Sequence, residues 1–279
     1  MSAALTGAAP MLPALAVPLA GLDGIDLAEL TERASLLTRV DRKYVLPRSA
    51  LDAVLEDLDP AVRVLDINGV RASAYESVYF DTPGLTSFLM AAQPRRRRFK
   101  IRTRTYVDSA QSYLEVKTRG GRGVTVKDRL PYGVDECRTL TTEGRRYVDS
   151  VLDDAGIIGA AGQVLAPTLT TRYLRTTLFI PESSSRATID TGLSWSAVPL
   201  RNPPGRGSLW AGDSQLRLDR PQLAIVETKS GARASAVDRI LWAHGHRPAT
   251  ISKYGTGMAA LWGHLPANRW APVLRRYFR

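Results

Sequence analysis

Hydrophobic and polar residues alternate with a period of two along much of the chain, and this pattern predicts a fold rich in β-strands. Such alternation is typical of strands that bury one face. Eight strands are predicted, at Arg39–Leu46, Ala74–Asp81, Arg97–Tyr106, Ser112–Arg119, Gly123–Leu130, Leu169–Ile180, Ser185–Leu193 and Leu223–Ser230. The glycine-rich residues 119–123 are predicted to form a hairpin connection, because a phosphate-binding glycine loop would need a helix directly after it.

Helical spacing of apolar residues occurs in segments outside these strands. The predicted helices are Ile25–Leu37, a segment after Pro47 with Ser49 as its N-cap, Thr142–Asp154, Ala234–His244 and Gly255–His264. Residues 199–221 are rich in Pro, Gly and Arg and are predicted to be an irregular insertion. The fold class is therefore α+β, mainly β, with an antiparallel sheet. We expect a flexible N-terminal tail over residues 1–24, a single domain over 25–265 and a basic C-terminal tail over 266–279.

The net charge points to an anionic partner, and charge alone does not choose among nucleic acid, a membrane surface and phosphate. The 279 residues include 38 Lys and Arg against 27 Asp and Glu, a net charge of +11, with 44% hydrophobic residues. One cysteine excludes an internal disulfide framework, and no long apolar segment predicts a membrane span. No basic segment precedes the proline-interrupted residues 1–22, so no signal peptide is expected. We expect a cytoplasmic protein that does not span a membrane, and a membrane-protein partner stays open.

Two common catalytic motifs and the usual RNA-binding pattern are missing from the sequence. It contains neither a Walker A sequence nor a G-x-S-x-G element, so P-loop and serine-hydrolase chemistry have no support. Aromatic residues make up 7%, without interleaved basic and aromatic positions of the kind that bind RNA. We therefore expect no specific nucleic-acid partner.

Charged residues gather on one face of the predicted strands. Arg102 and Arg104 alternate with Phe99, Ile101 and Thr103. The other strands follow the same pattern, with charged positions at Asp41, Lys43, Glu115, Lys117, Lys127, Arg129, Arg175, Glu227 and Lys229. An ordinary solvated sheet face would explain alternation alone. The excess of cations and the repeated Glu-x-Lys pattern instead favour a sheet closed with its charged faces inward and its helices outside. That basic interior would bind a phosphate anion through Arg and Lys and a divalent metal through Glu.

These residues resemble the VTC (vacuolar transporter chaperone) domain, the polyphosphate polymerase branch of the triphosphate tunnel metalloenzymes. The matching stretches follow the family order over about residues 35–260: DRKY at 41–44, SVYFDT at 77–82, RFKIRTR at 98–104, YLEVK at 113–117, VKDR at 126–129, YLR at 173–175, VETK at 226–229 and SKY at 252–254. The resemblance implies a tunnel of eight antiparallel strands, the same number as the predicted strands.

The resemblance also implies roles for individual residues. Residues expected to bind the triphosphate or the growing chain as the catalytic set are Lys43, Arg102, Arg104, Lys117, Lys127, Arg175 and Lys253. Tyr173, Lys100, Arg129, Lys229 and Ser252 are expected to contact substrate. Glu227 would hold Mn²⁺ or Mg²⁺, and Glu115 would be a second ligand.

Two positions depart from the family pattern. The first strand often carries E-x-E-x-K in the wider superfamily, whereas Arg39 replaces the first carboxylate here, which fits the VTC branch better than the hydrolytic branches. Thr250 stands where better-known polymerases carry a lysine. We expect a metal-dependent phosphotransferase that moves the γ-phosphoryl group of ATP onto inorganic polyphosphate. A tri- or polyphosphatase and a non-catalytic polyanion-binding module are the alternatives.

Overall fold

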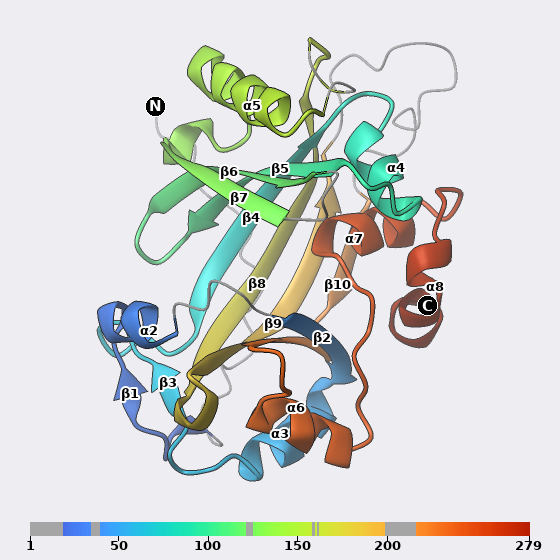
Figure 1. The fold of residues 1–279 in the computed structure, drawn as a ribbon. Helices are drawn as coiled ribbons and strands as arrows, with labels where there is room; N and C mark the ends of the chain where they lie inside the picture. The colour runs from blue at the N-terminus through green and yellow to red at the C-terminus, as the bar shows by residue number, and fades with distance from the viewer. Residues whose placement is uncertain (1–18, 35–39, 121–124, 158–159, 161, 199–215) are drawn as a thin grey trace. The chain divides into compact units, whose positions relative to one another are not determined.

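The fold was described from a computed structural model, over residues 19–34, 40–120, 125–157, 160, 162–198 and 216–279. The strands are β1 (Gly24–Ile25), β2 (Val40–Pro47), β3 (Arg63–Leu65), β4 (Ser73–Asp81), β5 (Arg98–Tyr106), β6 (Gln111–Arg119), β7 (Thr125–Tyr132), β8 (Ala166–Ile180), β9 (Ser185–Ala197), β10 (Arg217–Arg220) and β11 (Leu223–Ser230) (Figure 1). The α-helices are α2 (Leu27–Arg33), α3 (Arg48–Glu56), α4 (Thr86–Ala92), α5 (Thr142–Asp154), α6 (Ala236–Ala243), α7 (Lys253–Leu261) and α8 (Ala271–Val273). The chain is therefore α+β and mainly β, as predicted.

One sheet of 11 strands contains all of the predicted strands. Its main path has the order β2-β11-β9-β8-β4-β5-β6-β7, and the registers of these strands are antiparallel wherever they are defined. These eight strands are the eight that alternation predicts. The short strands β1, β3 and β10 lie off this path and were not predicted.

Closure of the sheet into a barrel is not confirmed. Within the described residues β2 pairs with β11 and β7 pairs with β6, and no pairing joins β2 to β7. A closed barrel would need that last row of hydrogen bonds. Most side chains of β7 are exposed or partly exposed, as expected for the edge strand of an open sheet.

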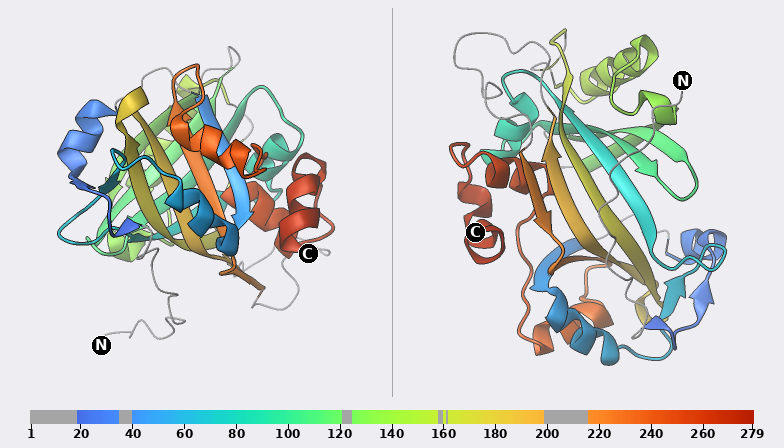
Figure 2. Two further views of the ribbon diagram at one scale, coloured as in Figure 1. Left: turned by 90° about the horizontal axis from the view of Figure 1, so that it is seen from below. Right: turned by 180° about the vertical axis from the view of Figure 1, so that it is seen from behind.

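The chain divides into two compact units. The first contains Met1–Ala72, Leu174–Leu193 and Arg220–Pro248, and the second contains Ser73–Tyr173, Ser194–Asp219 and Ala249–Arg279. The long strands β8 and β9, drawn in yellow and gold in Figure 2, each contribute residues to both units. The single domain predicted over residues 25–265 stays a prediction.

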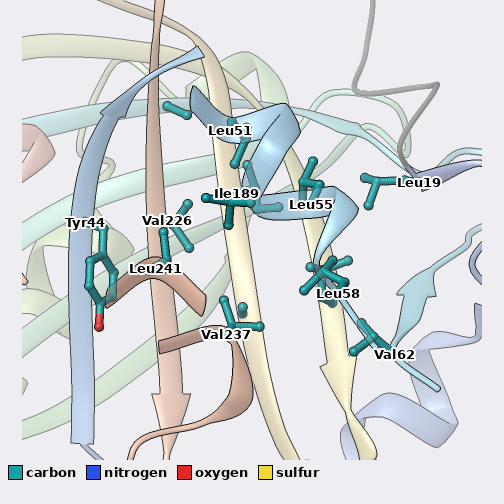
Figure 3. Packing of buried hydrophobic residues seen from close by; sticks show 14 of the residues in the cluster. Leu19, Tyr44, Leu51, Leu55, Leu58, Val62, Ile189, Val226, Val237 and Leu241 are labelled. Carbon is teal, nitrogen blue, oxygen red and sulfur yellow. The ribbon is translucent and has the colours of Figure 1, made fainter. Parts of the chain in front are cut away.

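The core of the first unit lies between the apolar face of its strands and helices α3 and α6. Tyr44 of β2, Ile189 of β9 and Val226 of β11 pack with Leu51 of α3 and Leu241 of α6 (Figure 3). The helices therefore cover the face of these strands that is opposite to the charged one.

Helix α3 begins at Arg48 after Pro47 and has no side-chain cap, so Ser49 is not its N-cap.

The core of the second unit repeats this arrangement with α5. Ile101 of β5 and Val116 of β6 pack against Val148 and Leu152 of α5, which lies over β6 and β7 (Figure 1). The bounds of α5 are the predicted ones, and Thr141 caps it by accepting a hydrogen bond from the Gly144 amide.

Both predicted tails have described parts that are structured. Leu19 belongs to the core of the first unit, while residues 1–18 lie outside the described residues. Residues 268–278 form short helical turns, and Trp270 among them is 1% exposed. Of the predicted insertion 199–221, residues 199–215 lie outside the described residues. No helix in the described part of the chain is long and apolar enough to cross a bilayer.

Candidate active site

The charged face of the second unit is built by β5, β6 and β7 in register. Arg102 lies opposite Glu115, which lies opposite Arg129 on the next strand. One row along, Lys100, Lys117 and Lys127 lie opposite one another. Like charges in adjacent cross-strand positions repel and destabilise a sheet. This face therefore favours the binding of an anion.

Glu115 is the centre of the cationic cluster on this face. Its Oε2 atom accepts hydrogen bonds from Arg102 Nε at 2.8 Å and Nη2 at 2.6 Å, and Arg104 Nε lies 3.9 Å away. Its Oε1 atom lies 2.6 Å from Lys127 Nζ. The carboxylate is buried, and each of its two oxygens contacts a protein cation. Burial alone would raise the pKa of Glu115, but Arg102, Arg104 and Lys127 hold it well below its usual range.

The first turn of α7 brings two further predicted residues onto this face. Ser252 caps the helix by accepting from the Gly255 amide at 3.1 Å, and its hydroxyl also accepts from Lys100 Nζ at 3.0 Å. Lys253 Nζ lies 4.4 Å from the ring centroid of Tyr173. The serine that caps the helix therefore also places Lys253, the residue that follows it.

A second charged cluster lies in the first unit, between β2, β11 and β9. Lys43 and Glu227 are opposite each other in the sheet, and Lys43 Nζ lies 2.7 Å from Glu227 Oε1. Lys229 Nζ approaches the same oxygen at 3.9 Å. Burial would raise the pKa of Glu227, whereas Lys229, Lys43 and Arg175 hold it well below its usual range. Burial also lowers the pKa of Lys229 to about 8, against the opposing effect of Glu227.

Arg175 of β8 is held by a carboxylate that the sequence analysis did not single out. Its Nε and Nη2 atoms donate to Asp190 Oδ1 and Oδ2 at 2.6 and 2.8 Å, a bidentate ion pair with a carboxylate that is 1% exposed. Asp190 follows Arg186 and Thr188 at alternate positions of β9. The same alternation that identified Glu227 could therefore have identified Asp190.

The structure thus places the predicted residues in two groups. Arg102, Arg104, Lys127, Glu115, Lys100, Lys117, Arg129, Ser252, Lys253 and Tyr173 belong to the second unit, and Lys43, Arg175, Glu227 and Lys229 belong to the first. Missed side chains include Tyr79, whose hydroxyl accepts from Arg102 Nη1 at 3.2 Å. The buried hydroxyls of Ser77 and Thr188 lie opposite Arg104 and Glu227 and have no hydrogen-bond partner within the described residues.

The two glutamates differ in how well they fit a divalent metal. Both ammonium contacts of Glu227 reach Oε1, and the orphaned Thr188 hydroxyl is its cross-strand neighbour. This arrangement fits a hard cation held by one carboxylate with substrate oxygens completing its coordination, which is a common way of binding Mg²⁺. Glu115 has cations on both oxygens and fits a metal less well. The described residues contain no group of three or more His, Cys, Asp or Glu that could form a complete protein cage.

A comparison with protein families matches this charged sheet to a known family. The sequence model described as "VTC domain" matches residues 38–262, which include both charged clusters. The chain belongs to the VTC domain family. This membership supports a function in handling phosphoryl groups. The eight strands of the main path, the Ser-Lys-Tyr helix start and the cationic faces described above all lie within the matched VTC domain.

Solved structures with a similar fold are distant. A candidate adenylate cyclase from Vibrio parahaemolyticus is 12% identical, with a TM-score of 0.42, and the match covers 80% of this chain and 98% of that one. A candidate adenylyl cyclase from Hippeastrum, described as having a dominant triphosphatase activity, is 15% identical, with a TM-score of 0.45 and coverages of 80% and 96%. These likenesses are too remote to support an argument about this VTC domain. No protein of curated function matched the sequence.

Proposed function

We propose that this VTC domain is a metal-dependent phosphotransferase that moves the γ-phosphoryl group of ATP onto a polyphosphate chain. The observation that carries the proposal is the cationic face of β5–β7. Among the described residues of these strands, Glu115 is the only acidic residue on this face. A multiply charged phosphate compound is the ligand that best relieves this repulsion. Arg102, Arg104 and Lys127 would bind its oxygens.

The reaction requires no covalent bond between the protein and the transferred phosphoryl group. A terminal phosphate oxygen of the acceptor chain attacks the γ-phosphorus, the bond from that phosphorus to the β,γ-bridging oxygen breaks, and ADP leaves with the electron pair. The acceptor oxygen is already anionic at neutral pH, so no general base is needed. The cationic side chains would align the two ligands and offset the charge that develops during transfer.

The state of the carboxylates favours transfer over hydrolysis. General-base activation of a water molecule is most efficient when the pKa of the base lies near the working pH. The pKa values of Glu115 and Glu227 are both held well below the usual range by neighbouring cations. Either glutamate would therefore be a weak base, which suits a reaction whose nucleophile is already ionised.

Glu227 is the proposed metal ligand. When bound, Mn²⁺ or Mg²⁺ would supply positive charge that offsets the negative charge of phosphate groups. Lys43 would keep the Glu227 carboxylate ionised and oriented through its contact at 2.7 Å. Lys253, Tyr173 and Ser252 would add contacts to substrate from the start of α7 and from β8.

The test is incubation of the purified protein with ATP and Mn²⁺, followed by separation of the products. Chain product with ADP supports the proposal, whereas free phosphate alone identifies a phosphatase and no turnover with retained tripolyphosphate binding identifies a binding module. Glu227→Gln should abolish turnover and keep the fold. Glu182→Gln is the matched control, because Glu182 is exposed and pairs with Arg239 on the surface. Wild-type activity in Glu227→Gln would contradict the metal assignment.

A further inference from the structure

Four tyrosines form a continuous aromatic row across neighbouring strands of the second unit. Tyr173 of β8 stacks on Tyr75 of β4, with ring centroids 5.3 Å apart and an interplanar angle of 5°. Tyr75 contacts Tyr106 of β5 at 4.9 Å, and Tyr106 contacts Tyr113 of β6 at 6.1 Å in an edge-on arrangement. The strand order β8-β4-β5-β6 brings these rings side by side.

The tyrosine row, defined by these four residues, lies on the same face as the proposed phosphate-binding cations. Tyr75 is opposite Tyr106 in the sheet, Ser77 is opposite Arg104, and Tyr79 is opposite Arg102. Because side chains two positions apart share a face, Tyr106 follows Arg104 at about 7 Å and Arg102 at about 14 Å along β5. The row therefore continues the cationic face in the direction of the C-terminal end of β5.

Three cations contact rings of the row, among them Arg129, whose guanidinium lies 5.0 Å from the Tyr113 ring centroid. The Arg104 guanidinium lies 5.7 Å from the Tyr75 ring centroid and 3.9 Å from the Glu115 carboxylate. Lys253 Nζ lies 4.4 Å from the Tyr173 centroid. A ligand that binds Arg104 through a phosphate group therefore has an aromatic surface directly beside it.

The opposite end of the same strands is purely basic. Arg98 is opposite Arg119, and burial together with the guanidinium groups of Arg119 and Arg269 lowers the pKa of Arg98. The charged face is thus asymmetric, with aromatic rings at one end of β5 and β6 and arginines at the other. A linear phosphate chain has the same structure along its whole length and offers no group that stacks on aromatic rings. A nucleoside triphosphate is asymmetric in the same way as this face, with an aromatic base at one end and anionic phosphates at the other.

We propose that the tyrosine row binds the nucleobase of the donor nucleoside triphosphate and that its phosphates extend along β5 toward Arg98 and Arg119. The inference rests on the proposed function, since it names the subsite that distinguishes the nucleotide from a phosphate chain. Bases stack on aromatic side chains with little dependence on their identity. The row would therefore accept purine nucleotides generally and would fix the direction of the donor on the sheet.

The alternative is that the rings serve only cross-strand packing, which aromatic pairs also favour. Tyr75, Tyr106 and Tyr113 all remain partly exposed, so a purely structural row would leave aromatic surface in contact with water beside the phosphate-binding cations. Tyr173, by contrast, is buried. A ligand that stacks on the row would cover the exposed surface of these three rings. Its affinity should therefore depend on the rings, which a purely structural row does not require.

The experiment measures the affinities of ATP and of tripolyphosphate for the full chain by calorimetry. Tyr106→Leu should weaken ATP binding about tenfold, the effect of losing one base–aromatic stack, and should leave tripolyphosphate affinity unchanged within about twofold. Tyr106→Phe should bind both ligands like the wild type. Tyr113→Leu gives a second, independent test if Tyr106→Leu does not fold. Tyr277→Leu is the control, because Tyr277 lies in the C-terminal helical turn and outside the row.

The outcomes separate the two proposals. If the wild type does not bind tripolyphosphate, the proposed function fails. If tripolyphosphate binds and the leucine variants weaken both ligands equally, or weaken neither, the tyrosine row is not a nucleobase site and the proposed function stands. GTP should follow ATP in every variant. A tenfold loss that occurs with ATP but not with GTP would overturn the stacking mechanism.

Discussion

Tyr254 donates a hydrogen bond of 2.6 Å to the fully buried carboxylate of Asp81, and this contact fixes the start of α7. The same carboxylate accepts from the backbone amides of Thr82, Ser87 and Phe88 at 2.8 to 2.9 Å. Tyr254 directly follows Lys253, a predicted substrate-binding residue. The pair therefore connects the end of β4 and the start of α4 to the residues that begin α7.

Loss of this contact should cost stability. Tyr254→Phe removes the hydroxyl donor and should lower the free energy of unfolding by about 1–2 kcal/mol. Tyr147→Phe is the matched control and should be neutral or slightly stabilising, because the buried Tyr147 hydroxyl has no partner within the described residues. Urea denaturation of both variants checks the prediction. Equal losses in the two variants would show that the Asp81 contact contributes nothing of its own.

Two glycines of α7 are required by tryptophans that pack against them. A Cβ atom on Gly257 would lie 2.3 Å from Trp195 Cδ1, and one on Gly255 would lie 2.3 Å from Trp270 Cζ2. A glycine-to-alanine change normally stabilises a helix interior by about 1 kcal/mol. Here Gly257→Ala should instead destabilise the protein by about 1–3 kcal/mol, the usual cost of overpacking.

Thermal or denaturant unfolding of Gly257→Ala tests the packing of α7. Gly263→Ala is the control, because a Cβ atom there would have no neighbour within 4 Å. A Gly257→Ala protein that is more stable than the wild type would mean that Trp195 does not lie against this helix.

The pKa of Glu115 predicts how stability changes with acid. A carboxyl whose pKa is lowered on folding contributes stability above its unfolded pKa, near 4.5, and loses that contribution as the pH falls toward the lower folded value. Glu115→Gln should therefore be less stable than the wild type by about 3 kcal/mol at pH 7, since it leaves Arg102 and Lys127 without their carboxylate. This difference should shrink steadily below about pH 4.5.

Unfolding free energies measured from pH 7 down to pH 2.5 give this comparison. Glu143→Gln is the control, at an exposed position in the first turn of α5. Its free energy of unfolding should differ little from that of the wild type, without the decrease of the difference below pH 4.5 that is expected for Glu115→Gln. A stability gap between wild type and Glu115→Gln that stays constant with pH would contradict the ion-pair cluster.

Arg104 tests whether the charged face binds phosphate. Arg104→Ala should weaken tripolyphosphate binding by roughly 10- to 100-fold, the value of a hydrogen bond to a charged group, and should make binding less sensitive to salt. Arg104→Lys keeps the charge but loses the planar fork, so its affinity should fall between those of the wild type and the alanine variant.

The control for Arg104 is Arg138→Ala. Arg138 is largely exposed and pairs with Glu76, and its loss should leave binding close to that of the wild type. Calorimetric titration at two salt concentrations measures both effects. Indistinguishable affinities for all of these proteins would mean that Arg104 belongs to an ordinary solvent-exposed sheet face and does not bind phosphate.

Alternation in the sequence was enough to determine the strands of the main sheet and their charged faces. All eight predicted strands lie on the main path, and the registers confirm that Arg102 and Glu115 share a face, as do Lys43 and Glu227. These features are predictable because the side-chain direction in a strand is a local property of period two. Helix α5 was likewise predicted with the bounds that the structure shows, whereas its capping residue Thr141 was identified only in the structure.

Elements without a strong local signal were missed. Strands β1, β3 and β10 have two, three and four residues, too few for alternation to be recognised. Helix α4 has seven residues and follows Leu85, which has a left-handed backbone with φ of 54° and gives no side-chain cap. Trp270 lies in a segment predicted to be a tail, yet it packs against Phe88 and α7. In these cases tertiary contacts outweigh local preference.

The partners of the charged residues were decided only by the tertiary structure. Lys43 and Glu227 are 184 residues apart in the sequence, and Asp81 and Tyr254 are 173 apart. Alternation says which face a side chain occupies, but its partner depends on strand order and register, which long-range pairing sets. For this reason the sequence alone identified a basic face with a few carboxylates. Only the fold showed that Glu115 is enclosed by three cations, that Asp190 holds Arg175, and that four tyrosines meet in one row.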